Sequence, residues 1–158
     1  GKIRYYGISS IRPNVIREYV HRSNMVSVMM QYSLTDRRPE ETCLPLLQEH
    51  NIGVLARGSL AQGLLVDKPP KPYLQYSPED IQRAAEAVKA VSGPERSATQ
   101  TALQFALSHP AITSAIVGVR TRAQLAEAVQ SVGAPAVTGE ELFDLQQVLP
   151  ANRYQEHR

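Results

Sequence analysis

The interpretation of this sequence begins with Ser114-Ala-Ile-Val-Gly-Val-Arg-Thr-Arg-Ala-Gln-Leu-Ala-Glu-Ala-Val129, because a strand pattern in it passes directly into a helix pattern. Its first residues, 114–117, form a short apolar, partly β-branched run of the kind found in buried parallel strands. Thr121 and Gln124 have the spacing of a capping box, which predicts that a helix begins at Thr121. Three apolar residues then recur at helical spacing, namely Leu125, Val129 and Val132.

The junction between this strand and this helix has the features of an anion site. Free backbone N–H groups and the positive end of the helix dipole face one spot there. Gly118 allows the backbone to turn and a ligand to come close. Arg120 and Arg122 add guanidinium groups, which pair with phosphate in bidentate fashion. The pattern indicates a phosphate-bearing ligand, but a plain strand–helix junction with two solvated arginines fits the same residues.

Length and composition favour one domain and exclude several classes of protein. The chain has 158 residues, of which 42% are hydrophobic, enough for a core. The formal net charge is only +2, and no basic stripe interleaved with aromatic residues appears, so nucleic acid is not an expected partner. No apolar run reaches membrane-spanning length and no signal-peptide pattern is present, so we expect no membrane association.

Cysteine and histidine usage gives no sign of a disulfide framework or a metal site. The single Cys43 lies in an apolar helical pattern and is interpreted as a packed thiol, which fits a reducing, cytoplasmic location. No Cys/His spacing resembles that of metal ligands. The 4 histidines are scattered and are expected at the surface or at helix ends.

The rest of the chain alternates between strand and helix patterns. Earlier strands are predicted at Lys2–Ile8, Met25–Met30 and Asn51–Ala56. Helix starts are predicted by Pro or capping residues, at Pro13, Pro39, Ser77, Ser97 and Thr138. Such alternation predicts parallel βαβ units, with binding groups gathered at the carboxyl ends of the strands. An open doubly wound sheet and part of a (β/α)8 barrel both fit; in a barrel, phosphate binds at the loops after strands seven and eight.

A proline-rich loop follows the third predicted strand. The segment Asp67-Lys-Pro-Pro-Lys-Pro72 is long for a simple connector. Loops of this kind often cover a ligand, although a plain surface excursion is equally compatible with the sequence.

Four motifs together resemble the aldo-keto reductase family, and its bacterial reductases in particular. They are spread in order along the chain, at Gly1–Ser10, Met29–Tyr32, Gly53–Leu65 and Ala115–Arg120. The resemblance implies an α/β fold that is the C-terminal half of a (β/α)8 TIM barrel. Residues 1–158 would then form a single partial domain with strands five to eight, their helices and an extra C-terminal helix.

The resemblance also implies a nicotinamide cofactor site. Ser9, Ser10 and Gln31 stand where the family holds the carboxamide, and their groups can donate and accept as it requires. Arg57 stands where many members stack a Tyr on the nicotinamide. Further positions match the pyrophosphate loop (Gly58, Ser59, Leu60 and Gln62), the adenosine phosphate site (Gly118, Val119, Arg120 and Thr121), and the surroundings of the 2′-phosphate and adenine (Gln124, Glu127 and Ala128). Arg120 favours NADP over NAD, and Ala128 replaces an Asn that the family usually has.

The resemblance assigns no catalytic residue to this chain. The family's Asp, Tyr, Lys and His set comes from the first four strands, so we expect the chain alone to be inactive. Half a barrel leaves two free sheet edges and an open inner face, which invite association. We expect pairing with an N-terminal half barrel or with a second copy, and a start at Gly1 without Met suggests a piece of a larger protein. Residues expected to line the inner face are Ile3, Tyr5, Val28, Met30, Val54 and Ile116.

Three functions follow from these observations. The leading hypothesis is the NADP-binding half of an NADPH-dependent reductase that transfers hydride to a small aldehyde or ketone. The alternative is a non-catalytic nucleotide-binding or self-associating half-barrel module. The third is an unrelated open α/β domain that binds a small phosphate ester.

Overall fold

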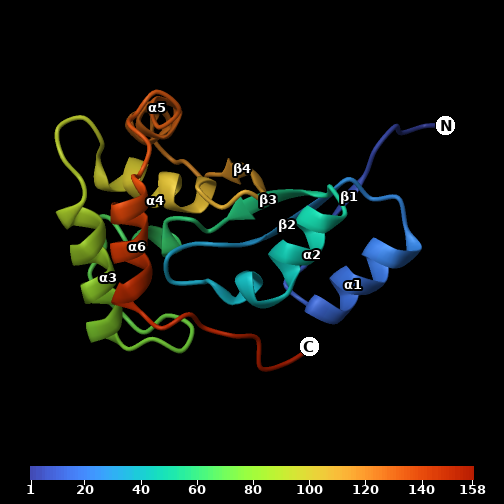
Figure 1. The fold of residues 1–158 in the computed structure, drawn as a ribbon. Coiled ribbons are helices and arrows are strands. Elements are labelled where there is room, and N and C mark those ends of the chain that lie inside the picture. Colours follow the sequence, from blue (N-terminus) through green and yellow to red (C-terminus); the bar gives the residue numbers. More distant parts are fainter.

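The computed structural model describes residues 1–158 and contains one parallel sheet (Figure 1). Its strands are β1 (Gly7–Ser9), β2 (Ser27–Gln31), β3 (Gly53–Arg57) and β4 (Ile112–Ile116). They lie side by side in the order of the sequence, and each neighbouring pair is parallel. This order lacks the reversal of strand order that defines a doubly wound sheet.

Helices follow every strand. They are α1 (Pro13–Arg22), the 3-10 turn η1 (Arg38–Glu41), α2 (Cys43–Glu49), the 3-10 turn η2 (Ala61–Gly63), α3 (Pro78–Ala90), α4 (Ala98–Leu107), α5 (Arg122–Gln130) and α6 (Gly139–Val148). Complete capping boxes start α3, α4 and α6, at Ser77, Ser97 and Thr138. The predicted helix after Pro39 is split into η1 and α2. None of the helices combines the length and the apolar character that crossing a bilayer requires.

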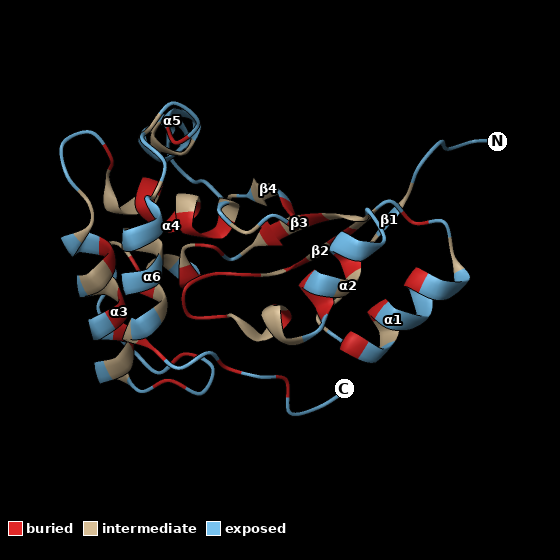
Figure 2. Ribbon diagram, in the orientation of Figure 1, coloured by how far each residue is buried: buried red, intermediate tan, exposed pale blue.

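Only one face of the sheet is covered by helices. Val28, Met30 and Val54 are fully buried, whereas the alternating residues Met29 and Leu55 remain half-buried (Figure 2). Successive side chains of a strand point to opposite faces, so the helices pack on one face and leave the other open. A doubly wound sheet has helices on both faces. The sheet is therefore one half of a (β/α)8 barrel.

This packing corrects the prediction of which residues line the inner face. Val28, Met30 and Val54 point toward the helices and belong to the core. Ile3 and Tyr5 lie outside the sheet and are about three-quarters exposed, at 73% and 74%. The residues of the inner face were predicted from their apolar character. In this half barrel, however, the most apolar residues of the strands lie on the opposite face, beneath the helices.

The first strand is shorter than the sequence pattern predicted. Pairing begins at Gly7, opposite Ser27, so residues 2–6 are not part of the strand. A side chain at position 7 would collide with Ser27, which explains why glycine stands where the two strands come together. The alternating pattern in Lys2–Ile8 correctly indicated an extended segment. It could not indicate that residues 2–6 have no partner strand.

Helix α5 differs from the others because it has no buried residue. Leu125, Val129 and Val132 are exposed by 51%, 62% and 87%. Their helical spacing correctly predicted a helix, yet this apolar stripe does not face the core. It lies open on a helix at the top of Figure 1, whose main neighbour is α4.

The C-terminal segment returns from α6 to α1. Tyr76 donates its hydroxyl to the carbonyl of Pro150 at 2.7 Å, and the Asn152 side chain accepts from the amide of Arg37 at 2.8 Å. Further along, the amide of Asn14 donates to the carbonyl of His157 at 2.9 Å. The segment thus links the two ends of the helical layer.

Candidate cofactor site

A cavity of about 620 Å³ lies at the carboxyl ends of β3 and β4, between the loop after β3 and helix α5. It brings together two of the segments that the sequence analysis singled out. The predicted cofactor residues that line it are Gly58, Ser59, Leu60, Gln62, Gly118, Val119, Arg120, Gln124, Glu127 and Ala128. The segments 58–62 and 118–128 are about sixty residues apart in the chain, and each forms one wall of this cavity.

The loop after β3 forms the first wall, and its backbone is tightly turned. Gly58 and Gly63 have φ values of +71° and +91°, in the left-handed region that favours glycine. Ala61 and Gln62 also have positive φ, at 48° and 61°. Amide-to-carbonyl bonds of 2.8 Å, from Ala61 to Gly58 and from Gly63 to Leu60, close the turns. The loop therefore has a fixed shape before any ligand binds.

Ser59 lies in this loop with an unsatisfied hydroxyl group. Its side chain is buried, and its Oγ has no hydrogen-bond partner in the protein. A buried polar group without a partner is unfavourable unless something else supplies the bond. Ser59 is also one of the residues that line the cavity, so its hydroxyl is a candidate partner for a polar ligand there once the side chain turns toward it.

The start of α5 forms the second wall. The Thr121 hydroxyl accepts from the amide of Gln124 at 3.1 Å, which confirms Thr121 as the helix cap. The Gln124 side chain accepts from the amide of Arg120 at 2.8 Å instead of that of Thr121, so the predicted capping box forms only in part. Thr121 does not line the cavity itself.

Gly118 opens onto the same cavity. A Cβ atom at this position would meet nothing within 4 Å, and φ is outside the left-handed region. The backbone turn therefore does not require glycine at position 118, although this was the first of the two roles predicted for it. The open space in front of Gly118 agrees with the other role, which is the close approach of a ligand.

Other lining residues come from elements that the sequence analysis did not connect with the site. Ala98, Thr99 and Leu103 of α4 line the cavity, because the helix crosses beside α5. Their only sequence signal was the capping box at Ser97, which locates the helix start but not its neighbours. Val66, Asp67 and Lys68 line it too, so the first residues of the proline-rich loop border the cavity, which favours the first of its two interpretations.

Ser9, Ser10 and Arg57 line a second cavity of about 410 Å³ between the carboxyl end of β1 and helix α1. The Ser10 hydroxyl accepts from the amide of Arg12 at 3.1 Å. Arg57 is followed directly by Gly58, so the two cavities adjoin along the chain. The structure thus places the predicted carboxamide residues beside the larger cavity and not within it.

Gln31 lines neither cavity. It stands opposite Arg57 in the β2–β3 register, and its amide donates to the hydroxyl of Tyr73 at 3.4 Å. Burial raises the pKa of Tyr73 further above neutral pH. Tyr73 fixes Gln31 at the carboxyl end of the sheet and was not anticipated from the sequence.

The sequence and the fold match a known family. The profile of the Aldo/keto reductase family matches residues 1–149. The chain therefore belongs to the aldo/keto reductase family.

Individual relatives agree with this assignment. An uncharacterized oxidoreductase of Bacillus subtilis (strain 168), YqkF, is 49% identical over 167 residues, which cover 100% of this chain and 54% of that protein. The NADH-specific methylglyoxal reductase of Escherichia coli (strain K12) is 34% identical over 74 residues, which cover 47% of this chain and 23% of that protein. The holo form of aldo-keto reductase AKR11C1 from Bacillus halodurans superposes with a TM-score of 0.90 and 43% sequence identity, covering 100% of this chain and 52% of that chain. The chain spans about half the length of the relatives that it matches in full.

Proposed function

We propose that this chain forms the NADP-binding half of an NADPH-dependent reductase of small aldehydes or ketones. The observation that carries the proposal is the 620 Å³ cavity, which has the unpartnered Ser59 hydroxyl in one wall and Arg120 at the start of a helix in the other. A hydroxyl donor and a helix N-terminus with a guanidinium suit phosphate groups. When bound, the nicotinamide dinucleotide supplies the hydride chemistry, and the protein supplies orientation.

The residues of this chain divide into three groups by the part of the cofactor they suit. The loop 58–63, with Ser59, suits the pyrophosphate. Arg120 and the first turn of α5 suit the adenosine phosphates, and Arg120 supports NADP over NAD. Ser9, Ser10 and Gln31 have the donors and acceptors that a carboxamide needs.

The proposed substrate class is supported by family membership and by one of the relatives. The Escherichia coli relative is a methylglyoxal reductase, and methylglyoxal is a small carbonyl compound. The same relative is NADH-specific, so the choice of NADPH for this chain rests on Arg120 and needs its own test.

We further propose that the reaction requires a second polypeptide region that closes the open inner face. The matched relatives are about twice as long as this chain. The apolar stripe on α5 and the free edges of β1 and β4 are surfaces that such a region would cover. By this proposal the chain binds cofactor but does not turn over substrate alone.

The cofactor proposal is tested by titrating NADPH and NADH against the chain and following nicotinamide fluorescence. We expect Arg120→Ala to weaken NADPH binding about tenfold, the effect of one charge-assisted contact, with a smaller loss for NADH. Arg122→Ala is the matched control, because Arg122 is the adjacent arginine but does not line the cavity. Equal losses for both cofactors, or for both variants, would contradict the assignment of Arg120 to the 2′-phosphate.

The non-catalytic alternative predicts a different outcome. A pure nucleotide-binding module would bind NADPH but give no carbonyl reduction in any combination with the remaining half of a relative. A scaffold without nucleotide function would give no change in NADPH fluorescence.

A further inference from the structure

Helix α5 forms a wall of the cavity without being held by apolar packing. Gln124, Glu127 and Ala128 line the cavity, yet no residue of the helix is buried. Helix α4 lies beside α5 and contributes Ala98, Thr99 and Leu103 to the lining. Because α5 faces the loop after β3 across the cavity, whatever fixes α5 on α4 also shapes the site.

Two hydrogen bonds join α4 directly to α5. The hydroxyl of Ser97 donates to the carboxylate of Glu127 at 2.6 Å. The amide of Gln104 donates to the carbonyl of Ser131, just after α5, at 2.7 Å. These two hydrogen bonds attach the middle and the end of α5 to α4.

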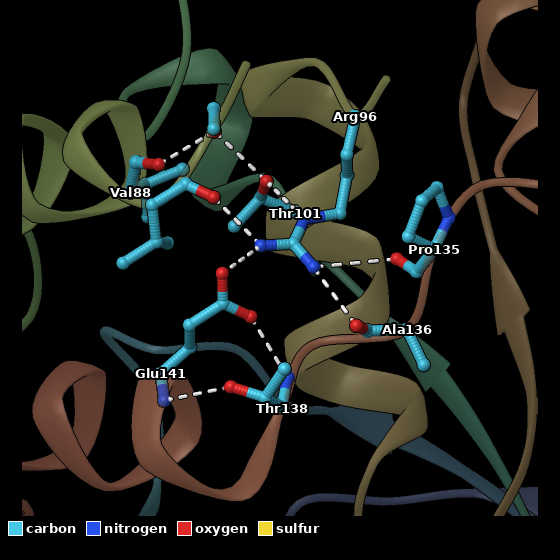
Figure 3. A network of polar contacts seen from close by, with 9 residues as sticks. Val88, Arg96, Thr101, Pro135, Ala136, Thr138 and Glu141 are labelled. Atoms are coloured by element: carbon cyan, nitrogen blue, oxygen red, sulfur yellow. Dashed lines mark hydrogen bonds and ion pairs between the residues drawn. The ribbon is translucent and has the colours of Figure 1, made fainter. Parts of the chain in front are cut away.

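The segment that follows α5 is held by Arg96, next to the cap of α4 (Figure 3). The Arg96 side chain is only 8% exposed. One of its terminal nitrogens, Nη1, donates to the carbonyls of Pro135 and Ala136, at 3.3 and 2.9 Å. Because these carbonyls lie between α5 and α6, Arg96 holds the exit of α5 against the start of α4.

The other donors of Arg96 attach it to the rest of the helical layer. Nη2 donates to the carbonyl of Val91, at the end of α3, and to the carboxylate of Glu141 in α6, both at 2.6 Å. Nε donates to the hydroxyl of Thr101 in α4 at 3.2 Å. The hydrogen bond from Arg96 also holds the pKa of Glu141 below its usual value, so this carboxylate stays charged. All five N–H donors of the guanidinium are used, which a lysine cannot reproduce.

We propose that Arg96 is a positioning residue of the cofactor cavity, which fixes the exit of α5 and thereby the spacing of α4 and α5. The inference rests on the proposed function, because it assigns a purpose to the geometry of the NADP cavity. Arg96 does not line that cavity, so any effect on the cofactor is transmitted through α5.

The test compares Arg96→Met with Arg37→Met in the full chain. Arg37 is the matched control, since it is also mostly buried, pairs with Glu40 and donates to the carbonyl of Gln146, but contacts no wall of the cavity. We expect R96M to speed amide hydrogen exchange in residues 122–130 and to weaken NADPH binding about tenfold. NADH binding should fall less, because α5 begins beside Arg120. R37M should lower stability without changing the ratio of NADPH to NADH affinity.

A second variant keeps the test decisive if R96M does not fold. Arg96→Lys keeps a positive charge near Glu141 but cannot reproduce the two hydrogen bonds to Pro135 and Ala136, so it should shift the exchange and the affinity ratio in the same direction by a smaller factor. Unchanged exchange of residues 122–130 in R96M would overturn the role of Arg96. If R96M does not fold, unchanged exchange in R96K would overturn it, as would an equal change of the affinity ratio in R37M. If the unmodified chain binds neither cofactor, the proposed function fails, while the exchange measurements still decide whether Arg96 holds α5.

Discussion

At the residue scale, Ser59 shows how a site can be recognised from an unsatisfied group. A buried hydroxyl without a partner destabilises a protein by about 1–3 kcal/mol. We therefore expect Ser59→Ala to stabilise the free chain by about 1 kcal/mol in urea unfolding and to weaken NADPH binding about tenfold in titration. Ser131→Ala is the contrasting control, because the hydroxyl of Ser131 donates to the carbonyl of Ala128 at 2.6 Å and its loss should destabilise the chain. NADPH affinity that is unchanged in S59A would remove this hydroxyl from the site.

His109 gives a prediction about pH. Its ring nitrogen Nδ1 accepts from the amide of Ala111 at 3.2 Å, and burial lowers the pKa of His109. The folded state therefore favours the neutral ring. The contribution of His109 to the free energy of unfolding is fully present above its pKa in the unfolded chain, about 6.5. This contribution is lost as the pH falls from that value toward the lower pKa of the folded state.

The measurement is urea unfolding at several pH values between about 7.5 and 5. His109→Asn keeps an acceptor for the amide of Ala111 but does not titrate, so its stability should fall less over this range. An equal decrease in both proteins would assign the pH dependence to other groups.

At the element scale, the helix caps separate local stability from cofactor binding. The hydroxyls of Ser77 and Ser97 each accept a hydrogen bond from the backbone amide three residues later, at the starts of α3 and α4. Replacing either by Ala should lower the free energy of unfolding by about 1 kcal/mol. Only Ser97 also holds Glu127, so only Ser97→Ala should weaken NADPH binding. Parallel unfolding and titration experiments on the two variants check this, and a loss of affinity in S77A would show that stability alone controls binding.

The caps also show what could be predicted from the sequence. Capping boxes depend on residues three apart, and those at Ser77, Ser97 and Thr138 correctly located three helices. The extent of β1 could not be predicted, because it depends on the partner strand. The exposure of Leu125 on α5 could not either, because helical spacing identifies an apolar side but not what covers it.

The site was predictable to a similar degree. The loop 58–62 and the start of α5 each carry a local motif, and the structure brings them together in one cavity. The place of Thr99 in the cavity and the hydrogen bond from Gln31 to Tyr73 depend on contacts between distant parts of the chain, and no local pattern predicts them. Arg96 was missed for the same reason, since its partners lie in four different segments.

At the scale of the whole molecule, the open inner face of the sheet is the dominant feature. The covered face carries fully buried aliphatic side chains, whereas the inner face carries the half-buried Met29, Gln31, Leu55 and Arg57. Free backbone groups along the edges of β1 and β4 add hydrogen-bonding capacity that this chain does not use. Together with the apolar stripe on α5, these surfaces favour binding to a further half barrel.

This leads to a prediction about assembly and activity. We mix the chain with the part of the 49%-identical Bacillus subtilis relative that it does not match, and follow association by analytical ultracentrifugation and NADPH oxidation with methylglyoxal. We expect a one-to-one complex and turnover only in the mixture, because the free edges and the stripe on α5 become covered. Val129→Lys places a charge in the middle of the stripe and should weaken the complex about tenfold or more, while Gln147→Lys, at an exposed position of α6, serves as the control for the added charge. Robust turnover by the chain alone would refute the proposal that the reaction needs the other half. A stable complex of two copies that excludes the added half would instead identify the stripe as a self-association surface.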